Sequence, residues 1–131
     1  MPLFSDDARA AIALALDEQV PGASELGAVA YVEQLLSAFE YDPPRIWAGP
    51  SGWIEPGPWE AQAWRQRIDE WRAVYERVAS GELARGDRRV VHTHACEATY
   101  GDPAYGGNRD EQGWVRVSFP SPQYPPTGAR A

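Results

Sequence analysis

The chain has 131 residues, a length that fits one domain with one hydrophobic core. Its net charge of −7 argues against a nucleic-acid binder, because such proteins need a basic surface, and against binding to anionic lipid. All twelve basic residues are Arg, which excludes a P-loop lysine and a Schiff-base lysine, and the single Cys96 excludes an internal disulfide. No apolar run approaches the roughly 20 residues that a membrane helix needs.

Two helices are predicted in the first third of the chain. Ser5 can cap the first, and apolar residues recur at helical spacing to about Asp17, before Val20-Pro21-Gly22 ends it. Ser24 can cap the second, which Asp42-Pro43-Pro44 ends. The apolar stripe of this second helix consists of Val29, Val32, Leu36 and Phe39.

A long loop and a third helix follow. From Pro43 to Pro58 the chain is rich in Pro and Gly, with Trp47 and Trp53 among them, which predicts a long ordered loop. Pro58 suits the first position of a helix, and Ser80-Gly81 supplies its end. The apolar stripe between them is the clearest in the chain, at alternating spacings of four and three. Its members are Trp64, Ile68, Trp71, Tyr75 and Val78.

The last third of the chain is less regular. Residues 88–100 fit a strand or a short helix, and we expect a fourth helix around His92 to Thr99. Val115, Val117 and Phe119 fit a short extended segment. The sequence thus predicts a mostly α fold: a single helical domain over residues 1–119 with long ordered Pro/Gly/aromatic loops and little or no β structure. Residues 120–131, with four prolines, are expected to form a Pro-rich arm that is extended or partly disordered.

Residues 99–117 combine tight turns with large aromatic side chains. Asp102-Pro103 and Gly106-Gly107-Asn108 are turn formers, because Pro fixes φ while Gly and Asn accept positive φ. A flexible linker would use Gly with Ser and few aromatics, so we expect an ordered loop packed against another surface. The aromatics of the loops could cover the core, stack on sugars or anchor a protein interface. They are Trp47, Trp53, Tyr105 and Trp114.

One segment carries potential metal ligands. His92, His94 and Cys96 are spaced by two, so on a strand they would share a face and could chelate a metal, with Glu97 as an added carboxylate. On a helix, His92 and Cys96 would share a face and His94 would lie elsewhere. A surface histidine pair beside a buried structural cysteine is favoured over a metal site or a catalytic thiol, because neither a second cluster nor a GxSxG-like context is present. No GxGxxG follows a strand-like run, so no dinucleotide site is predicted.

Two blocks of the sequence carry a family-like pattern. The longer consists of Glu97, then DPAYGGNRD over residues 102–110, then Gly113-Trp114 and Phe119-Pro120. The shorter reads VPGASELGAV over residues 20–29 and leads into a helix with Tyr31, Val32 and Leu35-Leu36. Both blocks resemble the gluconate 2-dehydrogenase subunit 3 family, and they occur in the family's order. The chain departs from the family at Ala98 and Thr99, where Gly and an aromatic are usual.

The resemblance implies a non-catalytic accessory small subunit. Such subunits bind and stabilise, and in some cases escort or mature, a large flavoprotein dehydrogenase of the glucose–methanol–choline type. The flavoprotein carries the FAD and oxidises the sugar or alcohol, a cytochrome c subunit accepts the electrons where present, and no cofactor is expected in this chain. The residues expected to shape the partner-facing surface are Asp102, Pro103, Tyr105, Gly106, Gly107, Asn108, Trp114, Trp47 and Trp53.

Other interpretations stay open. Trp47 and Trp53 could serve a stand-alone sugar-binding module, and the His92/His94/Glu97 cluster could serve a small oxidoreductase or isomerase. Asn108 and its two preceding glycines could instead hold a turn that closes the domain. The twin-arginine export signal common in the family is absent from the start of the sequence. The chain as written is therefore expected in the cytoplasm, or in a periplasmic or membrane-associated complex if a signal was removed or the partner carries one.

Overall fold

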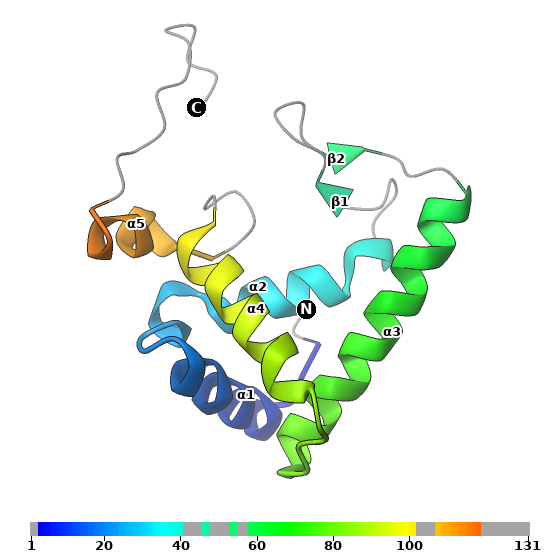
Figure 1. The fold of residues 1–131 in the computed structure, drawn as a ribbon, viewed down its shortest axis with the longest axis horizontal. Helices are drawn as coiled ribbons and strands as arrows, with labels where there is room; N and C mark the ends of the chain where they lie inside the picture. Colours follow the sequence, from blue (N-terminus) through cyan, green and yellow to red (C-terminus); the bar gives the residue numbers. More distant parts are fainter. Residues whose placement is uncertain (1–2, 41–45, 48–52, 55–57, 102–106, 119–131) are drawn as a thin grey trace, which may run out of the picture.

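Helices account for most of the described chain in the computed structural model (Figure 1). The structure describes residues 3–40, 46–47, 53–54, 58–101 and 107–118. The predicted mostly α fold is confirmed. The helices are α1 (Asp6–Gln19), α2 (Ala28–Leu36), α3 (Pro58–Ser80), α4 (Asp87–Tyr100) and α5 (Gln112–Arg116), with short 3-10 turns at Ser24–Leu26, Ala38–Glu40 and Arg109–Glu111.

Helix α1 begins and ends where the local sequence predicts. The hydroxyl of Ser5 accepts a hydrogen bond from the Ala8 N–H at 3.2 Å, which satisfies one of the free donors of the first turn. Ile12 and Leu16 are fully buried in the core. Val20 then takes an extended conformation and ends the helix.

The second helix is shorter than predicted at both ends. Ser24 does not cap it, because its N–H and its hydroxyl both donate to the Asp17 carboxylate, at 2.8 and 2.6 Å. Gly27 follows at a φ of 95°, a left-handed conformation that interrupts the helix, so α2 begins at Ala28. It ends at Leu36 rather than near Asp42, and the next residues form a 3-10 turn. The buried positions Val29, Val32 and Leu36 are as predicted.

The predicted loop from Pro43 to Pro58 is described in two short pieces. Ile46–Trp47 (β1) and Trp53–Ile54 (β2) pair antiparallel, with Ile46 opposite Ile54 and Trp47 opposite Trp53. Two strands of two residues agree with the expectation of little or no β structure. The rest of this loop, and the Pro-rich arm over residues 120–131, lie outside the described residues.

Helix α3 is the longest helix of the described chain. Pro58 is its first residue and Ser80 its last, and Gly81 ends it at a φ of 77°, all as predicted. Ile68, Tyr75 and Val78 are buried. Trp64 and Trp71, from the same stripe, are partly buried against the core.

Helix α4 crosses the molecule and contacts α1, α2 and α3 (Figure 1). It begins at Asp87, earlier than the predicted start near His92, and the strand alternative for this segment is wrong. The Asp87 carboxylate accepts two hydrogen bonds from the Arg77 guanidinium, at 2.8 and 2.9 Å, and one from the Ala84 N–H at 2.7 Å. These bonds join the last turn of α3 to the first turn of α4.

The extended segment predicted around Val115 and Val117 is wrong. Gln112–Arg116 forms the short helix α5, with Trp114 buried and both valines exposed, and Phe119 lies outside the described residues. Helix α5 packs against α4, and the Arg116 guanidinium donates to the Pro21 carbonyl oxygen at 2.6 Å. Among the described residues, no helix combines the length and the apolar character needed to span a bilayer.

Candidate functional site

Residues 107–114, the signature turn, are held against the end of α4 by one buried side chain. Asn108 is fully buried and takes a left-handed conformation at a φ of 46°, which Asn tolerates better than most residues. Its backbone N–H donates to the Ala98 carbonyl oxygen at 2.5 Å. Its side-chain amide donates to the Gly101 carbonyl oxygen and accepts from the Gly113 N–H, each at 2.7 Å. Asn108 thus satisfies backbone groups at the end of α4 and within the signature turn itself.

Two glycines let the signature turn approach α4 closely. A Cβ on Gly107 would overlap the Ala98 carbonyl oxygen, and a Cβ on Gly113 would overlap the Thr99 carbonyl oxygen. No side chain fits at either position without a shift of the α4 backbone. Gly is therefore required at both positions, because only a residue without a side chain lets the two backbone segments come this close.

Trp114 completes the contact between the signature turn and α4. Its side chain is 7% exposed, and its indole N–H donates to the Tyr100 carbonyl oxygen at 2.6 Å. That carbonyl belongs to the last turn of α4, where helical partners are missing. Gly107, Asn108 and Trp114 thus all contact the backbone at the end of α4.

An apolar rim flanks the signature turn. It comprises Tyr100, Val115 and Val117, which are 38%, 63% and 56% exposed. Of the five large hydrophobics that are exposed among the residues with described side chains, these three lie at the end of α4 or within and just after α5, and the other two are Leu14 and Leu83. Single exposed hydrophobics are ordinary, whereas a contiguous apolar patch is typical of an interaction surface.

The remaining residues predicted to face a partner are not placed. Asp102, Pro103, Tyr105 and Gly106 lie outside the described residues, and Trp47 and Trp53 are described only through the backbone of β1 and β2. Their role at an interface stays a prediction.

The two family-like blocks meet in the fold. The Tyr31 hydroxyl, on the helix into which the shorter block leads, donates to the Glu97 carboxylate of the longer block at 2.5 Å. The 3-10 turns Ser24–Leu26 and Arg109–Glu111, one from each block, also lie in contact. Residues that are far apart in the sequence therefore form one contiguous region at the end of the helical core.

Helix α4 separates the potential ligands of the His/Cys segment. His94 is 1% exposed, whereas His92 points outward and its Nε2 lies 3.5 Å from the Cys96 Sγ, as the helical alternative expects. Glu97 is engaged by Tyr31. The structure does not bring His92, His94 and Glu97 together, and the described residues contain no group of three or more His, Cys, Asp or Glu placed to hold a metal.

His94 is part of a buried aromatic cluster instead. Its Nδ1 lies 2.8 Å from the Tyr75 hydroxyl, and its ring meets Trp71 edge-on with the ring centroids 4.7 Å apart. Burial lowers the pKa of His94 to about 4, so the imidazole is neutral at pH 7. Burial and, secondarily, the charge of Glu97 raise the pKa of Tyr75 above its ordinary value. Both groups act as a neutral, hydrogen-bonded pair of the core.

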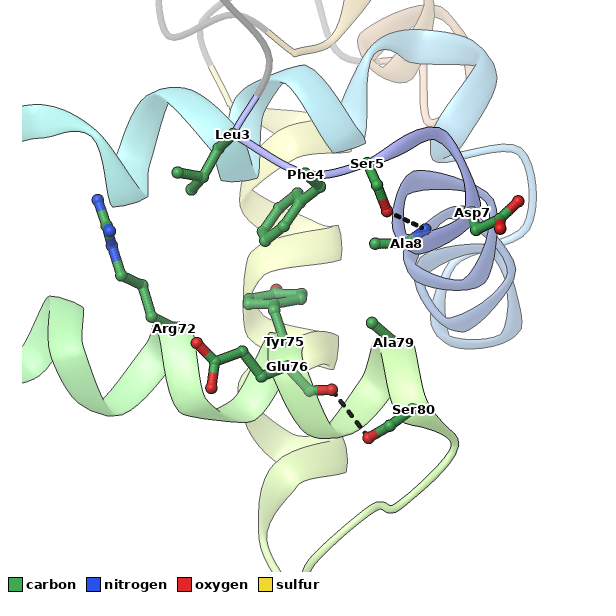
Figure 2. Close-up of a pocket in the computed structure, with 10 residues that line it drawn as sticks. All are labelled: Leu3, Phe4, Ser5, Asp7, Ala8, Arg72, Tyr75, Glu76, Ala79 and Ser80. Carbon is green, nitrogen blue, oxygen red and sulfur yellow. Dashed lines mark hydrogen bonds between the residues drawn. The ribbon is translucent and has the colours of Figure 1, made fainter.

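An open pocket of about 500 Å³ lies between the N-terminal segment and α3 (Figure 2). Phe4 lies over Tyr75 with the ring centroids 6.3 Å apart and forms its apolar wall, while Arg72 and Glu76 stand on its α3 side. The Arg72 guanidinium points toward α2, where it donates to the Leu36 carbonyl oxygen at 3.0 Å. Sequence reasoning missed this pocket, because its walls come from segments far apart in the chain and carry no shared motif.

Comparisons of the chain with protein-family models, with curated proteins and with solved structures find no match. The resemblance of the two blocks to a known family is therefore an observation on the sequence alone. Their contact in space is the structural observation that accompanies it.

Proposed function

We propose that this chain is a non-catalytic accessory subunit that binds and stabilises an FAD-dependent flavoprotein dehydrogenase acting on a sugar or alcohol. In this proposal the flavoprotein holds the FAD and performs the oxidation, and a cytochrome c subunit accepts the electrons where one is present. The chain resides where its partner resides, in the cytoplasm or in a periplasmic, membrane-associated complex.

The observation that carries the proposal is the apolar rim beside the signature turn. Tyr100, Val115 and Val117 expose apolar surface at the end of α4 and along or just after α5, next to a turn that Asn108 and Trp114 hydrogen-bond to the backbone at the end of α4. A fixed backbone that presents apolar and aromatic side chains loses little entropy on binding, which favours a protein partner. The contact between the two family-like blocks supports the choice of partner, because the resemblance covers the region that supports the rim.

Co-expression tests the proposal. A glucose–methanol–choline-type flavoprotein encoded beside this chain should co-purify with it on an affinity tag, and its FAD content and solubility should fall when the chain is left out. The FAD absorbance of the purified flavoprotein and a dye-linked dehydrogenase assay measure both effects. A flavoprotein that is soluble, fully loaded with FAD and active without this chain contradicts the proposal.

Variants of the rim locate the interface. Val115→Asp places a charge at a site that is 63% exposed, so it should leave the fold intact and weaken the complex by roughly 30-fold, the cost of losing an interface hot spot. Leu14→Asp is the matched control, because Leu14 is a helical hydrophobic that is 67% exposed on α1. Far-UV circular dichroism checks the fold of both. Equal co-purification of both variants with the flavoprotein would show that the rim is not part of the interface.

A further inference from the structure

A second pocket, of about 280 Å³, lies where α1, the start of α2 and the signature turn meet. Two of its lining residues are arginines, Arg9 from α1 and Arg109 from the signature turn. The rest of its lining includes small residues from both helices, among them Ala13, Gly27 and Ala30. Small side chains leave room for a ligand between the two arginines.

Of the two arginines that line this pocket, Arg9 has an ion-pair partner among the described residues and Arg109 does not. Arg9 is paired with the buried carboxylate of Glu33, which also accepts the Leu3 N–H at 2.7 Å. The Asp17 carboxylate is engaged by the N–H and hydroxyl of Ser24. No ion pair joins Arg109 to another residue in the described part of the chain. Among the described residues, the lining therefore includes the exposed guanidinium of Arg109 outside any ion pair, and it includes no carboxylate.

The start of α2 adds to this electrostatic preference. Gly27 has no side chain to cap the helix, and no described side chain does so in its place. Gly27, Val29 and Ala30 all line the pocket, so the first turn of α2 borders it. The partial positive charge of a helix N-terminus favours an anion at such a place.

We propose that this pocket binds an oxyanion, a carboxylate or phosphate group, with Arg109 as its main ligand. The planar fork of a guanidinium donates two parallel hydrogen bonds to such a group. The oxyanion can come from a free small molecule or from a carboxylate side chain of the flavoprotein, and only the second source rests on the proposed function.

The first experiment uses the purified chain alone. Inorganic phosphate and acetate are titrated at constant ionic strength, which keeps general screening fixed, while arginine Nε–H signals are followed by ¹H–¹⁵N NMR. The Arg109 signal should shift saturably, whereas that of Arg88, exposed on α4, should not. Ala30→Leu should abolish the shift, because it fills the pocket and leaves every charge in place.

The second experiment measures co-purification with the flavoprotein for Arg109→Gln and the control Arg88→Gln. A loss of about tenfold in affinity for Arg109→Gln alone, without a shift in the first experiment, identifies a carboxylate of the partner as the ligand. A saturable shift in the isolated chain identifies a free anion. If neither effect appears, the anion site is wrong. If the wild-type chain forms no complex, the proposed function fails and the first experiment alone decides the site.

Discussion

At the residue scale, Gly113 is the tightest position of the signature turn. Gly113→Ala should lower the free energy of unfolding by about 3 kcal/mol, since its Cβ would overlap the Thr99 carbonyl oxygen and the two backbones must separate. Gly81→Ala is the control, because no atom lies within 4 Å of a Cβ there and only the φ of 77° is unfavourable, at about 1 kcal/mol. Urea unfolding measures the free energy of unfolding of both variants. Equal losses would mean that the signature turn can shift away from α4 at little energetic cost.

His94 makes stability depend on pH. Its pKa is about 4 in the folded chain against an ordinary 6.5, so the unfolded chain takes up the proton more readily. The contribution of neutral His94 to stability is therefore fully present above pH 6.5, and it is lost as the pH falls toward 4. At 1.36 kcal/mol per pH unit this window corresponds to about 3 kcal/mol.

Unfolding in urea above pH 6.5 and near pH 4 checks this expectation. His94→Gln cannot titrate and should lose less stability than the wild-type chain over the same interval, by about 3 kcal/mol. His92→Gln, at an exposed position of the same helix, should behave like the wild type. An identical pH profile for His94→Gln and the wild type would show that His94 is not protonated on unfolding.

At the scale of elements, the junction of α3 and α4 depends on one carboxylate. The hydrogen bonds from Arg77 chiefly lower the pKa of Asp87, so its contribution to stability is present above the ordinary pKa of 3.8 and is lost as the pH falls through the lowered value. Asp87→Asn should lower the Tm by several degrees at neutral pH, and the difference from wild type should narrow in acid. Asp69→Asn, exposed on α3, is the control for calorimetry. A neutral-pH Tm equal to that of wild type would show that the junction holds without this ion pair.

At the scale of the whole molecule, the buried residues of α1, α2, α3 and α4 form one cluster. Trp71 belongs to its edge through His94, and Trp114 lies in the signature turn that packs on α4. Secondary structure and the tryptophan environments should therefore be lost together. Urea transitions followed by far-UV circular dichroism and by tryptophan fluorescence should coincide. A fluorescence transition at lower urea would mean that the signature turn detaches before the helices unfold.

The sequence by itself determined the elements whose boundaries are local. Ser5 caps α1, Pro58 opens α3, and Gly81 ends α3, because each acts on backbone groups within one turn of itself. The apolar stripe of α3 likewise predicted Ile68, Tyr75 and Val78 as core, since helical spacing alone places them on one face.

Only the tertiary structure decided the features that depend on distant partners. Asp17 binds Ser24 and displaces the predicted cap. The end of α4 receives Asn108 and Trp114, and the helix α5 forms where a short extended segment was predicted. The residue types of the signature turn predicted tight turns, but they could not say which surface those turns would meet. The surface that the turns meet is set by the packing of α4 across the core. These contacts join residues that are far apart in the sequence, so no local pattern predicts them.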